Sequence, residues 1–225
     1  MTASTSIEAF SKTNGKLIVF EGVEGCGKTS QIERALIWLN NFLIHKEVFV
    51  TREPGGTDLG IRLRQLLLEQ KQVSQIQNTA ELLLYAADRA QHVEEVLKPK
   101  LARGAIILCD RYTDSTIAYQ GYGRGLNLAL IHQLNDLATS GLLSDLTLWL
   151  DVNVEISLER KRERQVADRI EQEAIAFHRR VQQGYNQLAL DHPNRIVRVD
   201  ASLSEAAVQE QIQAILRQRL VEELA

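Results

Sequence analysis

Gly22-Val23-Glu24-Gly25-Cys26-Gly27-Lys28-Thr29 fits the pattern G-x-x-x-x-G-K-[ST], a loop whose glycines let backbone N–H groups turn toward phosphate oxygens. In this pattern Lys28 offers a cation to the terminal phosphates, and Thr29 can give its hydroxyl oxygen to Mg²⁺. The apolar run at 17–20 predicts a buried strand before the loop, and apolar residues at helical spacing predict a helix at 31–42 after it. Strand, loop and helix in this order indicate that the loop binds a nucleoside triphosphate; the alternative is a glycine turn without a ligand.

The composition is typical of a single α/β domain. The 225 residues, 44% of them hydrophobic, can bury a substantial core, and we expect one domain at 15–225 after a loose tail at 1–14. The net charge of −3 argues against a protein that coats nucleic acid through bulk electrostatics. No apolar stretch reaches the ~18 residues of a membrane span, and two cysteines give no disulfide framework. We therefore expect a cytoplasmic protein without a nucleic-acid or membrane partner.

Four further apolar runs predict strands that alternate with helices. Strands are expected at 47–51, 105–109, 146–150 and 195–199, and helices at 58–69, 79–101, 126–140, 154–164, 170–190 and 204–220. Connections of this length form right-handed crossovers, so the pattern predicts a doubly wound, five-stranded parallel sheet flanked by helices. Ligands of such sheets bind beyond the carboxyl ends of the strands.

Charged side chains follow the predicted strand ends and should gather at one edge of the sheet: Lys28, Arg52, Glu53, Asp110, Arg111 and Asp151. Arg111 is the best candidate to bridge two phosphate groups, because a guanidinium group binds phosphate oxygens in pairs. The alternative is a surface ion pair of Arg111 with Asp110 or Asp114. Asp110 follows an apolar strand directly and suits Mg²⁺ or its water shell, and Asp151 could do the same by position.

Five segments resemble the thymidylate kinases: GVEGCGKT at 22–29, TREPGG at 51–56, LLYAADRAQH at 83–92, DRYTDSTIAYQGYGRG at 110–125 and ERKRERQVADRIE at 159–171. The resemblance implies the P-loop NTPase fold of the nucleoside monophosphate kinases, with a lid around 159–171, and a homodimer. It also implies transfer of the γ-phosphoryl group of ATP to dTMP with Mg²⁺, which gives dTDP and ADP for dTTP synthesis. DRY is the family's pattern, so the resemblance favours Asp110 over Asp151 at the metal.

The resemblance assigns further residues to the phosphates and the sugar. Glu53 would help to organise the metal and its waters, Arg52 would approach the acceptor phosphate, and Glu24 would take the sugar 3′-hydroxyl. Arg64 stands where the family has another arginine for the monophosphate. From the residues alone, Arg52 and Glu53 could instead be a pair that stabilises a turn, and Arg64 could be a solvated helix charge.

Two pairs of residues, each four apart in the sequence, predict a pocket for the acceptor base. Tyr85 can stack on thymine while Arg89 hydrogen-bonds its carbonyl edge; the family usually carries Phe at the position of Tyr85. Thr116 and Gln120 offer donors and acceptors to a pyrimidine edge or a ribose. The alternatives are a core aromatic with a surface arginine for the first pair, and ordinary helix polarity for the second.

The lid segment carries three candidate arginines for the donor phosphates. The variable positions of the phosphate loop are not basic, so the chain resembles the family form in which the basic residue lies in the lid. Arg164 is the first candidate, with Arg160 and Arg162 behind it. The alternative is a solvated helix whose charges are balanced by neighbouring glutamates.

The reaction needs positioning and charge neutralisation more than proton transfer. A phosphate monoester is mostly dianionic at neutral pH, so no general base is expected beside the catalytic candidates Lys28, Glu53, Arg111 and Arg164. Two other interpretations stay open. One is a kinase for a different nucleoside monophosphate, which the loop and lid would serve equally. The other is a nucleotide-dependent switch; one that binds GTP should carry the motif N-K-x-D, which the sequence lacks.

Overall fold

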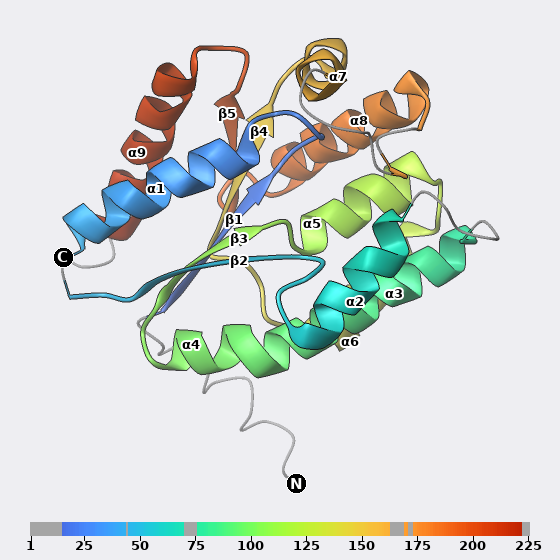
Figure 1. Ribbon diagram of the computed structural model, residues 1–225, viewed down its shortest axis with the longest axis horizontal. Coiled ribbons are helices and arrows are strands. Elements are labelled where there is room, and N and C mark those ends of the chain that lie inside the picture. Colours follow the sequence, from blue (N-terminus) through green and yellow to red (C-terminus); the bar gives the residue numbers. More distant parts are fainter. Residues whose placement is uncertain (1–14, 44, 70–75, 163–168, 171–172, 222–225) are drawn as a thin grey trace, which may run out of the picture.

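The computed structural model describes residues 15–43, 45–69, 76–162, 169–170 and 173–221 and shows a sheet between layers of helices (Figure 1). The strand order is β2-β3-β1-β4-β5, and every pairing is parallel. The strands are β1 (Lys16–Glu21), β2 (Val48–Arg52), β3 (Ile106–Asp110), β4 (Leu146–Asp151) and β5 (Ile196–Asp200). The predicted five-stranded parallel sheet is confirmed, and the bounds of each strand lie within one residue of expectation.

Helices cover both faces of this sheet, as predicted. They are α1 (Lys28–Phe42), α2 (Asp58–Leu68), α3 (Asn78–His92), the π-helical η2 (Val93–Leu97), α4 (Lys98–Ala102), α5 (Thr113–Thr116), the π-helical η3 (Ile117–Gly123), α6 (Leu128–Thr139), α7 (Val154–Arg162), α8 (Ile175–Asp191) and α9 (Glu205–Val221). Figure 1 shows α1 and α9 side by side along one face of the sheet and α4 along the other. In the described part of the chain, no helix is both long and apolar enough to cross a membrane.

The strand order opens a crevice at the ends of β1 and β3. These strands are neighbours, but the chain leaves β1 toward β2 on one side and leaves β3 toward β4 on the other. Diverging connections leave space beyond the carboxyl ends of the two strands, where ligands of such sheets bind. The register pairs Asp110 with both Phe20 and Arg52, so β1, β2 and β3 end at the same edge.

Apolar residues of the central strands alternate between two cores. In β1, Ile18 and Phe20 pack with the core that includes residues of α1 and α9. Leu17 and Val19 face the opposite side, where they meet residues of η2 and α4. Because both faces are buried, the strand is apolar at four consecutive positions, 17–20, rather than at alternate positions.

The expected helix at 79–101 is divided by a π-helical turn. The N–H of Lys98 donates to the carbonyl of Val93, one residue further back than in an α-helix. Pro99 has no N–H, and in a regular α-helix its ring would clash with the carbonyl of Glu95. The wider turn just before Pro99 removes this conflict.

The helical segment formed by α5 and η3 was not among the helix ranges predicted from the sequence, although the pairing of Thr116 with Gln120, four residues apart, assumed a helix there. A Cβ on Gly121 would lie 2.5 Å from the side chain of Leu128, and one on Gly123 would lie 2.7 Å from the ring of Phe177. The glycines therefore allow η3 to pack closely against α6 and α8. The helix expected at 170–190 begins at Ile175, and the predicted tail at 1–14 lies outside the described residues.

Candidate active site

A cavity of about 670 Å³ lies at the carboxyl edge of the sheet. The residues that line it fall into two groups, which we call lobes: a loop lobe, formed by the phosphate loop and the segment 201–208, and a helix lobe, formed by residues of α2, α3 and η3. The residues predicted for the site that line it are Glu24, Gly25, Cys26, Gly27, Lys28, Thr29, Arg52, Glu53, Arg64, Tyr85, Arg89, Asp110, Arg111, Thr116 and Gln120.

The phosphate loop is shaped by its glycines and its lysine. Gly22, Gly25 and Gly27 have φ angles of 140°, 76° and 96°, which side chains other than glycine rarely adopt. Lys28 donates from Nζ to the carbonyl oxygens of Gly22, at 3.1 Å, and Val23, at 3.2 Å, so its ammonium group lies over the loop. The loop leads into α1, whose N-terminal dipole favours an anion at this place.

Two side chains of the loop contribute to the core, and one is open to solvent. Val23 and Cys26 are buried among the apolar residues beneath the loop. Burial raises the pKa of the Cys26 thiol, so this group stays protonated at neutral pH. Thr29, in the first turn of α1, is exposed at the cavity, so its hydroxyl can reach a ligand there.

Arg111 lies where the two lobes meet. Its guanidinium group donates from Nη1 to the carbonyl oxygen of Gly22, at 3.0 Å, and from Nη2 to the hydroxyl of Tyr119, at 3.1 Å. It also forms an ion pair with Glu24. Burial alone would lower the pKa of Arg111, but the Glu24 carboxylate together with Tyr119, Tyr185 and Asp110 outweighs burial, and the pKa lies well above its ordinary value. Arg111 is therefore a permanent cation that faces the cavity.

The predicted alternative for Arg111, a surface ion pair with Asp110 or Asp114, is not what the structure shows. Asp114 pairs instead with Arg195, at 2.6 Å. The φ angle of Arg111 is 73°, in the left-handed region that residues other than glycine rarely adopt. Such strained conformations cluster at active sites and ligand-binding segments.

A buried carboxylate at the end of β1 holds the segment that carries Arg111. Glu21 accepts hydrogen bonds from the backbone N–H groups of Tyr112, at 2.9 Å, and Ser115, at 3.1 Å. It also accepts from the hydroxyls of Ser115, at 2.6 Å, and Tyr185, at 2.7 Å. Burial raises the pKa of Glu21 above its usual value. Glu21 was not predicted as a residue of the site. Its position in the sequence, as an acidic residue at the end of an apolar strand, could have indicated it.

Glu53 and Arg89 form a buried ion pair, at 2.8 Å, beneath the helix lobe. The other oxygen of Glu53 meets Nδ1 of His92, at 2.9 Å, and Nε2 of His92 meets the hydroxyl of Thr51, at 2.7 Å. Glu53 therefore contacts Arg89 through one carboxylate oxygen and His92 through the other. Its predicted partner Arg52 has an exposed side chain, so the two are not a pair that stabilises the turn.

Arg89 is only 2% exposed, so the alternative of a surface arginine is wrong. Besides Glu53, it donates to the side chains of Thr116 and Asn135, both at 2.8 Å, and to the carbonyl oxygen of Tyr112, at 3.0 Å. These bonds use four of the five N–H donors of the guanidinium group. A single donor is left for a ligand in the helix lobe.

Asp110 and Asp151, the two alternatives for a metal, have different surroundings. Oδ1 of Asp110 is buried without a hydrogen-bond partner in the described part of the chain, and Asp110 lines the cavity. Asp151 accepts from Gln182, at 2.9 Å, and from Arg198, at 2.7 Å. It is not among the residues that line the cavity. The free carboxylate oxygen at the cavity belongs to Asp110.

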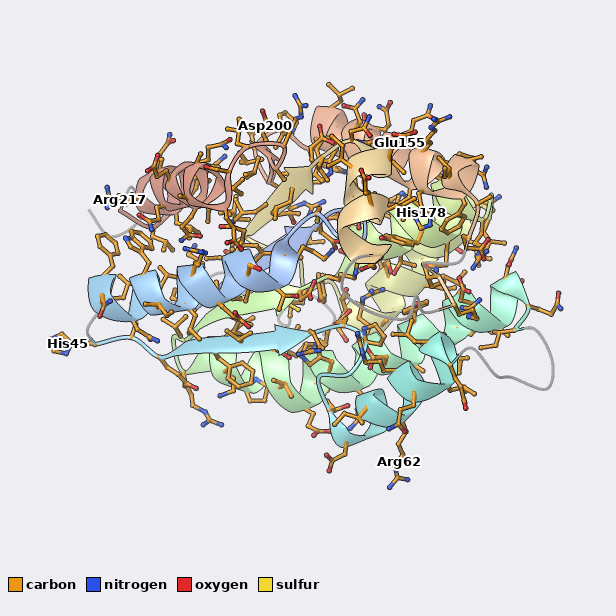
Figure 2. The ribbon with its side chains drawn as sticks, turned by 45° about the horizontal axis from the view of Figure 1, so that its top comes forward. His45, Arg62, Glu155, His178, Asp200 and Arg217 are labelled. Carbon is orange, nitrogen blue, oxygen red and sulfur yellow. The ribbon has the colours of Figure 1, made fainter. Side chains whose placement is uncertain are left out.

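The two arginines of α2 have different positions. Arg64 is half-buried and donates to the carbonyl oxygen of Pro54, at 3.0 Å, which places it beside the TREPGG turn. Arg62 is exposed, and Figure 2 shows it pointing away from the body of the protein. The alternative of a solvated charge therefore fits Arg62 and not Arg64.

The residues predicted for the base line the helix lobe. Tyr85, on α3, is half-buried, while Thr116 and Gln120, from α5 and η3, are buried. Gln120 donates to Glu81, at 2.8 Å, and Glu81 also pairs with Arg124 and Arg169. Glu81, Arg124 and Arg169 were not predicted from the sequence, because their roles depend on contacts between distant segments.

The loop lobe ends at a segment that carries no recognisable motif. Ala201, Leu203, Ser204 and Val208 line it together with Glu205, whose backbone carbonyl accepts a hydrogen bond from Gln31, at 2.9 Å. In the sequence, only the position of this segment directly after the last strand could have indicated that it lines the site. In the lid, the side chains of Arg160, Arg162 and Arg164 lie outside the described residues.

Known proteins resemble the chain along most of its length. The family model for thymidylate kinase matches residues 20–212. The thymidylate kinase of Nostoc punctiforme is 66% identical over 207 residues, which cover 92% of this chain and 97% of that protein. That of Trichormus variabilis is 63% identical over 209 residues, with 92% and 98% covered. The crystal structure of thymidylate kinase from Ehrlichia chaffeensis has a TM-score of 0.73 and 33% identity, over 90% of this chain and 98% of that one. The chain belongs to the thymidylate kinase family.

Proposed function

We propose that the cavity transfers the γ-phosphoryl group of ATP to dTMP, giving dTDP and ADP, the reaction of the thymidylate kinase family. ATP occupies the loop lobe, with its phosphates in the glycine loop and its base near 201–208, and dTMP occupies the helix lobe. The observation that carries this assignment is the position of Arg111, a permanent cation where the lobes meet. The two sets of phosphates come together between Lys28 and Arg111.

Catalysis in this arrangement rests on cations. Phosphoryl transfer between two nucleotides gathers several negative charges, and Lys28 and Arg111 neutralise them as the transferred group moves. The acceptor phosphate has its second pKa near ~6, so it is already mostly dianionic at neutral pH. No side chain needs to remove a proton from it.

Glu24 changes its partner in this proposal. It pairs with Arg111 and lies beside the phosphate loop. A dTMP phosphate that binds Arg111 competes with the Glu24 carboxylate, and Glu24 can then accept a hydrogen bond from the sugar 3′-hydroxyl. The same carboxylate thus keeps Arg111 in place and later orients the acceptor.

The residues beside the loop fit Mg²⁺, which prefers oxygen ligands and keeps several waters. Asp110 offers the buried carboxylate oxygen without a partner among the described residues, and Thr29 offers an exposed hydroxyl. When bound there with ATP, Mg²⁺ would supply positive charge to the phosphates. Asp110 and Thr29 would hold and orient it, directly or through water.

The helix lobe recognises the acceptor through its base and its phosphate. Tyr85 stacks on thymine, and the remaining N–H of Arg89 reaches a carbonyl oxygen of the base. Thr116 and Gln120 meet the pyrimidine edge. Arg52 and Arg64, beside the TREPGG turn, bind the acceptor phosphate.

Glu53 acts through Arg89 in this assignment. Its two oxygens contact Arg89 and His92, so it fixes the arginine that reads the base. The family's role for Glu53 at the metal and its waters remains a prediction, as does the role of a lid arginine at the donor phosphates. Arg164 is the first candidate for that role, with Arg160 and Arg162 as alternatives.

We further propose a homodimer in the cytoplasm. The helices α2, α3 and α6 pack together and carry exposed apolar side chains, among them Leu59, Leu83, Leu130 and Leu137. A second copy of the chain would cover them, and light scattering at micromolar concentration should then give twice the mass of one chain. The two cysteines are free and buried, which suits a reducing compartment.

Release of ADP tests the reaction. The protein is mixed with ATP, Mg²⁺ and one acceptor at a time, chosen from dTMP, dUMP, UMP, CMP and AMP, or with no acceptor. We expect fast release with dTMP and a background rate without acceptor. Equal rates with and without dTMP would contradict phosphoryl transfer and favour a nucleotide switch, and a preference for AMP would contradict the assignment of the helix lobe.

A further inference from the structure

The side-chain amide of Gln120 is oriented by a buried carboxylate. Its Nε2 donates to Oε1 of Glu81, at 2.8 Å, and the two side chains are only 2% and 0% exposed. A carboxylate only accepts hydrogen bonds, so the amide cannot turn over without losing this bond. In the described part of the chain, no donor reaches the amide oxygen of Gln120. Because Gln120 lines the cavity, that oxygen is the group available to a ligand in the helix lobe.

Two arginines keep Glu81 ionised. Arg124 donates to both carboxylate oxygens, from Nε at 3.3 Å and from Nη2 at 3.2 Å, and Arg169 donates to Oε2. Burial alone would raise the pKa of Glu81, but hydrogen bonds from Gln120 and Arg169 and the charge of Arg124 lower it below its ordinary value. At neutral pH Glu81 therefore has no proton to donate to Gln120.

The orientation of an amide matters for the choice between pyrimidines. Thymine and uracil carry an N–H at position 3, whereas cytosine carries a lone pair there. An amide oxygen accepts a hydrogen bond from the N3–H group and repels the N3 lone pair. A site that presents a fixed acceptor rejects the wrong base more strongly than an apolar pocket does, because a buried polar group is left unpaired.

We propose that Glu81 is a positioning residue that makes the helix lobe select thymine and uracil against cytosine, by holding Gln120 with its oxygen toward the base. The proposal rests on the assignment of Gln120 to the acceptor base. Arg124 and Arg169 support it by occupying the remaining acceptor positions of Glu81. None of the three has to touch the nucleotide.

The substitution Glu81→Gln tests this directly. The new amide keeps its oxygen at the position of Oε2, toward Nη2 of Arg124 and Arg169, and its NH₂ group takes the place of Oε1. There it loses the 3.3 Å bond from Nε of Arg124 and donates toward Gln120. Gln120 then turns over and presents Nε2 to the base. We expect the ratio of kcat/KM for dCMP to that for dTMP to rise by about tenfold or more, the effect of exchanging one matched hydrogen bond for a mismatch.

Glu173→Gln is the matched control. Glu173 pairs with Arg124 in the same cluster but not with Gln120, so this variant should leave the ratio unchanged. An equal shift in Glu173→Gln, or an unchanged ratio in folded Glu81→Gln, would overturn the proposal. If Glu81→Gln does not fold, Glu81→Asp keeps the charge for both arginines and shortens the reach to Gln120. Its ratio should also rise, and an unchanged ratio would count equally against the proposal.

Two measurements separate this inference from the assignment on which it rests. The unaltered protein should turn over N3-methyl-dTMP far more slowly than dTMP, and equal rates would overturn the proposed orientation of Gln120 without any mutation. In Gln120→Ala, normal kcat/KM for dTMP would refute the role of Gln120 at the base. A loss there, together with an unchanged ratio in the Glu81 variants, would refute only the role of Glu81.

Discussion

The two lobes of the cavity are built in opposite ways. The loop lobe is made by eight consecutive residues and the short segment 201–208, and it offers an anionic ligand backbone N–H groups, a helix dipole and the ammonium group of Lys28. The helix lobe takes side chains from α2, α3, β3 and η3, and its buried charged groups Glu53 and Arg89 form an ion pair. One lobe is local in the sequence and the other depends on tertiary packing.

This difference has an energetic consequence. Removal of one partner from a buried ion pair leaves an uncompensated charge and costs about 3–5 kcal/mol. A substitution in the helix lobe should therefore affect the free energy of unfolding together with acceptor binding. The loop lobe relies on backbone groups that no side-chain substitution removes, so a substitution of its cavity-facing Lys28 should affect the nucleotide and leave stability nearly intact.

Arg111→Ala should have the largest effect, because it removes the cation shared by both lobes. We expect kcat to fall by about 10³-fold or more, as when a guanidinium that stabilises a phosphoryl-transfer transition state is lost. Steady-state ADP release with saturating ATP and dTMP measures it. Circular dichroism should show that Arg111→Ala is folded. Arg111→Lys should recover only part of the rate, because an ammonium group cannot bind two phosphate oxygens at once as a guanidinium group does. Normal turnover in Arg111→Ala would remove this residue from the mechanism.

The contrast between the lobes also explains what the sequence could predict. The strands and the phosphate loop were predictable, because burial on both faces makes strands such as β1 and β3 continuously apolar and because the loop motif is contiguous. Arg89 was predicted at the base, but its burial and its four internal hydrogen bonds were not. Those bonds depend on how α3 packs against β2, α5 and α6, which no local pattern records.

The same limit applies to Glu21 and Glu81. Each is a fully buried carboxylate that becomes acceptable only when donors from distant segments surround it. Glu21 meets donors from residues 112, 115 and 185, and Glu81 meets donors from 120, 124 and 169. A prediction from local hydrophobic periodicity assigns acidic residues to the surface, so it does not identify buried carboxylates.

Glu53→Gln should show the coupling of stability and binding in the helix lobe. The variant leaves Arg89 without a charged partner, so we expect the free energy of unfolding to fall by about 3 kcal/mol and KM for dTMP to rise, with KM for ATP nearly unchanged. Urea unfolding and steady-state kinetics measure the two effects. A loss of kcat without any change in stability would instead support a direct role of Glu53 at the metal and its waters.

Arg64→Ala and Arg62→Ala compare two arginines of one helix. Arg64 contacts the TREPGG turn at the cavity, whereas Arg62 points into solvent (Figure 2). We expect KM for dTMP to rise about tenfold in Arg64→Ala, the loss of one charge-assisted phosphate contact, and to stay unchanged in Arg62→Ala. KM for ATP should not change in either variant. Equal effects of the two substitutions would show that only the general positive charge of α2 matters.

The smallest effect on turnover is expected at Asp88, next to Arg89 on α3. Oδ1 of Asp88 accepts from the N–H of Gly55, at 3.0 Å, while Oδ2 is buried without a partner among the described residues. Burial, and then the nearby Glu53 carboxylate, raise the pKa of Asp88 to about 6. The folded state therefore holds a proton between pH 4 and 6 that the unfolded state releases, so the free energy of unfolding falls as pH rises through this window.

Asp88→Asn removes the ionisation, and its amide oxygen can still accept from Gly55. Relative to the unaltered protein, the variant should gain about 2 kcal/mol more in the free energy of unfolding at pH 8 than at pH 4.5, because the penalty for a charged Asp88 accumulates as pH rises from its unfolded to its folded pKa. Urea unfolding at both pH values measures this difference. Asp136→Asn, at an exposed position on α6, should show no such dependence on pH. If Asp88→Asn gave the same difference at both pH values, charge on Asp88 would not destabilise the helix lobe, and the ion pairs around Arg89 would have to compensate it fully.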